Sequence, residues 1–223
     1  MEEDVYDRQK NLSVLNHKNQ QYIRRIPQKV TVVGLGGIGS WVALDMAIAG
    51  VPNLVLIDSD SIEKHNLNRT PFKDIQVGMN KADAVNQLIL ERRDTKVTVY
   101  NKAYELLPSY FRHEIADSYL IDCRDNLDEL PYEVQKKLYL RYDGISMTVM
   151  RELPDQAFVP HTRGYDIVPS ILMPPQMLSA IATFIVLYDL SVTTATFDLF
   201  DLIEKLGIVY NNEEMIKVEQ EGV

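Results

Sequence analysis

The sequence predicts an α/β fold, with a mostly parallel sheet flanked by helices and with additional strands and helices in the C-terminal half. Short valine- and leucine-rich runs alternate with helical patterns in the first half, as in right-handed βαβ units. A glycine-rich corner joins the first of these runs to the first helical pattern. Acidic residues close the second and fourth runs, and such strand ends meet at the carboxyl edge of a parallel sheet, where ligands bind.

Four buried strands are expected in the first part of the chain, because each run is short, apolar and bounded by turn residues. They cover residues 29–34, 53–58, 96–100 and 119–122. Helices are expected between them, where apolar residues recur with the helical period. These cover residues 37–50, 81–93 and 109–116, and Ser109 is the expected N-cap of the last one.

The C-terminal half is expected to be more irregular. We expect a short helix over residues 133–138, then strands over 140–142 and 146–150 joined by a turn at Asp143-Gly144. Residues 152–175 hold five of the ten prolines and are expected to form no regular element. The apolar run over 176–190 predicts a core or interface helix, since a bilayer span needs about 20 apolar residues. Residues 197–206 have an amphipathic pattern.

Length and composition suggest one α/β domain with a sizeable core, or one domain plus an appendage. We expect a polar, partly helical N-terminal arm at residues 1–28, a ligand-binding α/β domain at 29–191 and a helical tail at 192–223. A net charge of −9 argues against a general nucleic-acid binder. The single cysteine, Cys123, excludes an internal disulfide and a multi-cysteine zinc site. No secretory signal is visible, so a cytoplasmic location without membrane contact is expected.

The glycine-rich corner is the strongest single motif, and it runs Val33-Gly34-Leu35-Gly36-Gly37-Ile38-Gly39-Ser40. Gly34, Gly36 and Gly39 fit the dinucleotide fingerprint, and Gly37 adds another residue without a Cβ atom. Such a corner presents backbone N–H groups and a helix N-terminus to a phosphate. Alone, it predicts a Rossmann-like site for NAD or a flavin.

Polar residues further along the chain change that interpretation. Asp58 ends the second strand, where a carboxylate accepts hydrogen bonds from ribose hydroxyls, and Asp60 either joins it or is a solvated turn acid. Arg69 and Lys81 follow, and two cations near a helix N-terminus can hold a polyphosphate. An NAD site does not ordinarily need them, although either cation alone would be interpreted as solvated.

Asp125 and Asn126 follow the fourth strand. A carboxylate at this position could hold Mg²⁺ against phosphates, whereas an Asp-Asn pair without the other motifs indicates a loop or a helix N-cap. His113 and His161 have no Ser or Cys partner in a recognisable arrangement, so we interpret both as surface or loop residues.

Taken in order, these motifs resemble the ThiF/MoeB family and the adenylation domains of ubiquitin-activating enzymes, over about residues 5–190. Members have a Gly-x-Gly-Gly-x-Gly loop, then an acid, Asn-Leu-x-Arg, a lysine and Asp-Asn. The resemblance implies nucleotide binding by Gly34, Gly36, Gly37, Gly39, Asp58, Asp60, Asn66, Asn68 and Asn126, and catalytic roles for Arg8, Arg69, Lys81 and Asp125. It implies that ATP is bound and that Asp125 holds Mg²⁺.

The resemblance also implies a reaction and an assembly. The reaction is attack of a carboxylate on the α-phosphate of ATP, which forms an acyl-adenylate and releases pyrophosphate. The acceptor would be the C-terminus of a small ubiquitin-like or sulfur-carrier protein, a peptide, or a modified nucleoside carboxylate. In a homodimer, the Tyr6-Asp7-Arg8-Gln9 arm would bring Arg8 to the nucleotide of the other subunit.

Several features depart from the family pattern. The Cys-x-x-Cys pairs for structural zinc are missing, so no structural zinc is expected. Thr70 replaces a frequent glutamine, and Asp128 and Glu129 stand where several members have an arginine. These departures keep a second hypothesis open, that of a non-catalytic partner or scaffold subunit. An NAD-dependent oxidoreductase is disfavoured, because no catalytic set for a substrate domain is recognisable.

Overall fold

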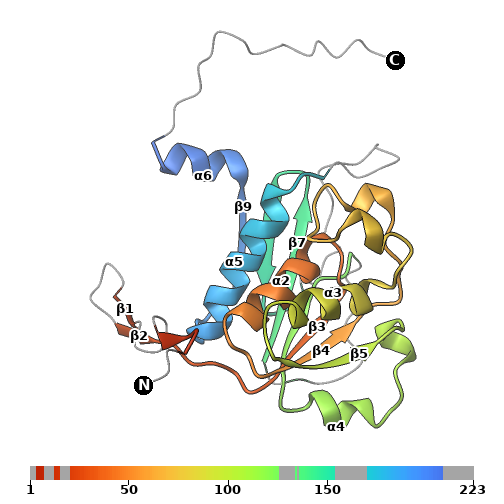
Figure 1. Cartoon of the computed structure of the whole chain (residues 1–223). Coiled ribbons are helices and arrows are strands. Elements are labelled where there is room, and N and C mark those ends of the chain that lie inside the picture. Colours follow the sequence, from red (N-terminus) through yellow and green to blue (C-terminus); the bar gives the residue numbers. More distant parts are fainter. Residues whose placement is uncertain are drawn as a thin grey trace, which may run out of the picture.

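The computed structural model describes residues 4–7, 13–15, 21–125, 134, 136–153 and 170–207. Its centre is a seven-stranded sheet in the order β5-β4-β3-β6-β7-β8-β9 (Figure 1). The strands are β3 (Val30–Val33), β4 (Asn53–Ile57), β5 (Lys96–Tyr100), β6 (Tyr119–Asp122), β7 (Lys136–Asp143), β8 (Ser146–Met150) and β9 (Thr194–Asp198). Strands β3 to β7 pair in parallel, and β8 and β9 add antiparallel pairs. The predicted mostly parallel α/β fold is confirmed.

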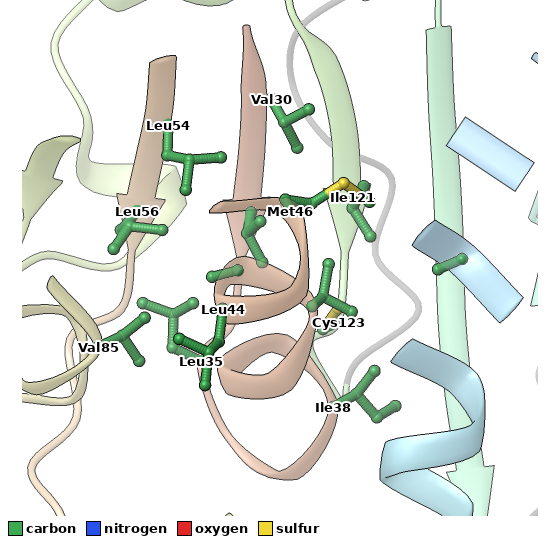
Figure 2. Packing of buried hydrophobic residues seen from close by; sticks show 14 of the residues in the cluster. Val30, Leu35, Ile38, Leu44, Met46, Leu54, Leu56, Val85, Ile121 and Cys123 are labelled. Atoms are coloured by element: carbon green, nitrogen blue, oxygen red, sulfur yellow. The ribbon is translucent and has the colours of Figure 1, made fainter. Parts of the chain in front are cut away.

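Helices cover both faces of the sheet, because alternate residues of each central strand bury their side chains on opposite sides. One face carries α2 (Gly37–Ile48), α3 (Lys81–Leu90) and α5 (Met173–Leu187), and the other carries η3 (Tyr104–Leu106) and α4 (Phe111–Ile115). In β4, Leu54 and Leu56 belong to the core under α2, α3 and α5, whereas Val55 and Ile57 pack with Tyr104 on the other side. Figure 2 shows the first of these cores.

Local sequence signals explain where two of these helices begin. The Asn80 side chain caps α3, since its Oδ1 atom accepts a hydrogen bond of 2.8 Å from the backbone N–H of Ala82. Helix α5 starts at Met173, earlier than predicted, with Pro174 and Pro175 in its first turn. Proline is tolerated there because the first N–H groups of a helix have no partner within it.

The helix predicted over residues 133–138 is wrong from residue 136 onward, where β7 begins. Lys136 pairs with Tyr119 of β6, and the pairing continues to Tyr139 opposite Asp122. Within β7, Leu138 joins the core under α2 and Tyr139 joins the opposite core. Pairing with β6 and burial on both faces therefore override the local helical pattern.

Two further expectations need correction. Ser109 does not cap α4, which begins at Phe111 after Tyr110 without any side-chain cap, because the backbone N–H of Phe111 bonds to the carbonyl oxygen of Pro108 in a turn. The expected helical tail at 192–223 contains strand β9, which pairs with β8 before α6 (Leu199–Lys205). Thr194 and Thr196 are β-branched, which suits an edge strand. The domain boundaries themselves stay a prediction.

Smaller elements complete the part of the chain that the structure describes. The N-terminal arm contains an antiparallel pair, β1 (Ser13–Leu15) and β2 (Gln21–Ile23), where a partly helical segment was predicted. The 3₁₀ helices η1 (Lys64–Asn66) and η2 (Asp74–Gln76) lie between β4 and α3. Helix α6 buries no side chain and projects from the sheet at the end of β9 (Figure 1). No helix in these residues is long and apolar enough to cross a bilayer.

Candidate active site

A cavity of about 280 Å³ opens at the carboxyl edge of the sheet, where residues following β3, β4, β5 and β6 come together. The sites predicted from the sequence that line it are Gly34, Gly36, Gly37, Asp58, Asp60, Asn66, Arg69, Lys81 and Asp125. Gly39 and Asn68 do not line the cavity, and Arg8 and Asn126 lie outside the described residues. The parallel topology thus gathers motifs that are scattered along the chain.

The glycines of the first corner have different structural tasks. Gly34 has φ +80°, in the left-handed region that favours glycine. A Cβ atom on Gly39 would lie 1.8 Å from the carbonyl oxygen of Gly34, so Gly39 lets α2 pack directly against the loop. A Cβ atom on Gly36 would meet nothing within 4 Å. Gly34, Gly36 and Gly37 line the cavity, whereas Gly39 does not and allows the close packing of α2 against the loop.

Asp58 ties the glycine corner to the end of β4. Its Oδ2 atom accepts a hydrogen bond of 2.5 Å from the backbone N–H of Leu35, and its Oδ1 atom accepts one of 2.8 Å from the N–H of Asp60. Burial raises the pKa of Asp58, and these hydrogen bonds act in the opposite direction. The carboxylate predicted to bind ribose is therefore also the link between two loops of the cavity.

Lys81 lines the cavity and forms an ion pair with Asp60. Its Nζ atom lies 2.8 Å from Oδ2 of Asp60, and its side chain is 12% exposed. The hydrogen bond from Lys81 lowers the pKa of Asp60, which therefore stays ionised. The sequence left open whether Asp60 belongs to the site or is a solvated turn acid. In the structure Asp60 lines the cavity and pairs with Lys81 there.

Arg69 is also held by the protein. Its Nη1 atom donates hydrogen bonds of 2.8 Å to the carbonyl oxygen of His65 and 3.0 Å to Oδ1 of Asn68. Asn66 stabilises the same segment, because its Oδ1 atom accepts a hydrogen bond of 3.0 Å from the N–H of Glu63 at the start of η1. In this structure Asn68 orients Arg69, and Asn66 both lines the cavity and caps η1.

Asp125 offers an exposed carboxylate at the cavity wall. No group of three or more His, Cys, Asp or Glu that could hold a metal occurs in the described residues. Mg²⁺ is commonly bound by one or two carboxylates together with substrate phosphates and waters, so a single carboxylate beside a phosphate site is compatible with it. Asp125 fits that role by its chemistry and its position.

Several cavity residues were not predicted from the sequence. They are Ser59, Lys102, Ala103, Tyr104, Glu105, Arg124 and Tyr142, together with apolar residues of the strand ends. The segment 102–105 and Arg124 each follow a parallel strand, and that position is the signal that could have identified them. Burial opposes the charged form of Arg124, but the hydrogen bond and charge of Asp122 raise its pKa above the ordinary value. Tyr142 lies within a strand and had no such signal.

Cys123 follows β6 and is buried. Figure 2 shows it among the apolar side chains of the core, which include Ile38 and Ile121. Burial raises the pKa of the Cys123 thiol, and the charge of Asp122 adds to this shift. The thiolate, which is the nucleophilic form, is therefore disfavoured at neutral pH.

Sequence comparison finds a matching family model and relatives of this chain. A family model described as "ThiF family" matches residues 6–135. Ubiquitin-like modifier-activating enzyme 5 of Arabidopsis thaliana is 41% identical over 73 residues, which are 33% of this chain and 16% of the relative. The adenylyltransferase and sulfurtransferase MOCS3 of Drosophila willistoni is 31% identical over 129 residues, 56% of this chain and 28% of the relative. The chain thus matches less than a third of either relative's length.

Structural comparison gives similar architectures at low sequence identity. A crystal structure of PaaA matches with a TM-score of 0.60 and 20% identity, over 78% of this chain and 70% of PaaA. Escherichia coli MccB in complex with AMPCPP and MccA matches with a TM-score of 0.55 and 19% identity, over 72% of this chain and 55% of MccB. At these identities the similarity establishes a shared fold.

Proposed function

The chain belongs to the ThiF family, and from this premise we propose that it activates a carboxylate with ATP and Mg²⁺. The carboxylate oxygen attacks the α-phosphorus, the bond to the bridging oxygen of pyrophosphate breaks, and an acyl-adenylate forms. The work of the protein is to position the two substrates and to neutralise charge, since no covalent bond to the enzyme is needed.

The observation that carries this proposal is the composition of the cavity. A glycine corner at the N-terminus of α2, the cations Arg69 and Lys81, and the carboxylates Asp58 and Asp125 are among the groups that line one space of about 280 Å³. Glycine backbone and the cations Arg69 and Lys81 suit phosphates, and Asp58 suits a ribose hydroxyl. Asp125 would hold Mg²⁺ when the metal is bound, which would offset negative charge on the phosphates.

The acceptor carboxylate is proposed from the names of the relatives. One relative is named as activating a ubiquitin-like modifier, and the MccB structure contains MccA. We therefore propose that the acceptor is the C-terminus of a small ubiquitin-like or sulfur-carrier protein, or of a peptide, with a modified nucleoside carboxylate as the remaining option. A cytoplasmic location and independence from structural zinc are parts of the same proposal.

The test is ATP–pyrophosphate exchange with a panel of candidate acceptors. We expect incorporation of labelled pyrophosphate into ATP that requires Mg²⁺ and one acceptor class, because adenylate formation is reversible while pyrophosphate is present. ATP binding without exchange for any acceptor would instead favour the non-catalytic partner subunit. Tight NAD binding with no ATP binding would contradict both hypotheses.

We also propose a homodimer in which Arg8 acts on the nucleotide of the neighbouring subunit. Arg8 lies outside the described residues, so the proposal depends on the family resemblance and on the exposed Phe184 of the apolar helix α5. Mixing inactive Arg8→Ala with inactive Asp125→Asn tests it, once subunit exchange has been demonstrated. Action in trans gives each mixed dimer one intact site, and we expect about a quarter of wild-type exchange activity from the mixing statistics of dimers. If no activity returns, Arg8 acts within its own subunit.

A further inference from the structure

Arg124 lines the cavity, and no motif assigns it a task. Its Nη2 atom lies 3.0 Å from Oδ2 of Asp122, and its Nε atom lies 3.2 Å from Oδ1 of the same carboxylate. Asp122 is fully buried at the end of β6. A planar guanidinium that meets a buried carboxylate through two nitrogens has a defined orientation. The guanidinium group of Arg124 is therefore fixed relative to the sheet.

The same guanidinium contacts the opposite loop. Its Nη1 atom forms a salt bridge with Oε1 of Glu105, and its Cζ atom lies 5.7 Å from the centre of the Tyr104 ring. Both partners belong to η3, which follows β5. Tyr104 is 1% exposed and packs edge-on against Phe111 of α4, so η3 is itself anchored. The Arg124–Glu105 ion pair thus connects the loop after β6 to the loop after β5.

The strand order indicates which part of a nucleotide this ion pair would meet. Under the proposed function, the glycine corner after β3 receives phosphates and Asp58 after β4 receives the ribose. The next strand beyond β4 is β5, and residues 102–105 after it line the cavity. A nucleotide that runs from the glycine corner past Asp58 therefore brings its base toward residues 102–105. Arg124 follows β6, on the other side of β3, and is connected to this segment by its ion pair with Glu105.

We propose that the Arg124–Glu105 ion pair forms the cavity wall against which the nucleoside half of the nucleotide binds, and so helps to determine nucleotide recognition. This inference rests on the proposed function, because it assumes that the cavity takes ATP. The flat face of a guanidinium whose edges are bonded to carboxylates suits stacking with a base. The exposed part of Glu105 adds a hydrogen-bond acceptor beside it.

The test compares ATP with AMP, which contains the nucleoside, and with inorganic tripolyphosphate, which contains only the phosphate chain. Binding of ATP, AMP and inorganic tripolyphosphate is measured by calorimetry for the wild type, Arg124→Gln, Glu105→Gln and the double variant. We expect each single variant to bind ATP and AMP about tenfold more weakly, because the stacking surface is lost or misplaced. Tripolyphosphate binding stays within twofold of the wild type. The double variant is no weaker than Arg124→Gln, because the two residues act as one unit.

Controls separate this role from general effects on the fold. Lys73→Gln breaks an exposed ion pair of 2.8 Å with Glu91, away from the cavity, and should leave all three affinities unchanged. Arg141, whose Nη2 atom lies 3.5 Å from Oδ2 of Asp122, keeps that carboxylate paired in Arg124→Gln. Glu105 is half exposed, so Glu105→Gln provides a variant that folds even where Arg124→Gln does not. Thermal unfolding of each variant verifies this.

Two results would overturn the inference while the proposed function stands. In the first, both variants bind ATP and AMP as the wild type does. In the second, tripolyphosphate binding falls as much as ATP binding, which would make Arg124 a phosphate ligand. A wild-type protein that binds neither ATP nor AMP would overturn the proposed function itself.

Discussion

Gly39→Ala is expected to lower the free energy of unfolding by about 3 kcal/mol or more, at the upper end of the cost of overpacking. The new Cβ atom would lie 1.8 Å from the carbonyl oxygen of Gly34. Gly34 itself lies close to the backbone of the next loop, since a Cβ atom placed on it would lie 3.0 Å from the backbone N of Arg124, and this leaves it little room to move aside. The gain of about 1 kcal/mol that alanine normally brings inside a helix is too small to compensate. Urea denaturation measures the loss.

Gly36→Ala is the matched control, since the same methyl group would meet no atom within 4 Å. Gly36 lines the cavity, so this variant should lose affinity for ATP while losing less than about 1 kcal/mol of stability. The two glycines thus separate stability from binding within one motif. Equal urea midpoints for the two variants would show that the contact between Gly39 and Gly34 is relaxed at little cost.

Asp125→Asn is expected to reduce ATP–pyrophosphate exchange at least about 100-fold, the scale seen when one stabilising group is removed from a transition state. The change removes a charge that would hold Mg²⁺ and retains the shape of the side chain. Because Asp125 is exposed, the free energy of unfolding should change by no more than about 0.5 kcal/mol. Exchange assays over a range of Mg²⁺ concentrations, with urea denaturation alongside, measure both quantities.

Asp117→Asn is the corresponding control, because Asp117 is an exposed carboxylate just before β6, at the end of that strand opposite to Asp125. It should exchange at the wild-type rate. If Asp125→Asn keeps the wild-type rate and the wild-type dependence on Mg²⁺, then Asp125 is not the metal carboxylate. The proposal of Mg²⁺ binding at this position would then have to be abandoned.

The first half of the fold was predictable because local and long-range preferences agree there. Strand β4 is a short apolar run that ends at Asp58, and α3 has an apolar period and an N-cap at Asn80. The prediction failed at 133–138, where the residues have helix-forming character but β6 offers a partner for parallel pairing. Strand β9 was missed for a related reason, since its exposed residues show no apolar alternation and only β8 identifies it.

The candidate site also has a part that the sequence could predict and a part that it could not. Asp58, Lys81 and Asp125 could be found because each follows a strand end or opens a helix, and parallel topology brings such positions together. The partnership of Arg124 with Glu105 could not, because the two residues meet only after η3 has packed against the sheet. Residue type and spacing therefore predict which groups surround a cavity, and tertiary packing decides which of them act together.

The link that Asp58 makes between Leu35 and Asp60 has a consequence for the entropy of binding. These hydrogen bonds order the glycine corner and the loop after β4 as one unit while the chain folds. A nucleotide that arrives later meets a preorganised surface and does not have to immobilise either loop. More of the interaction energy then remains for holding and orienting the ligand. We therefore expect the backbone around residues 34–36 to have nearly the same order parameters before and after a nucleotide binds.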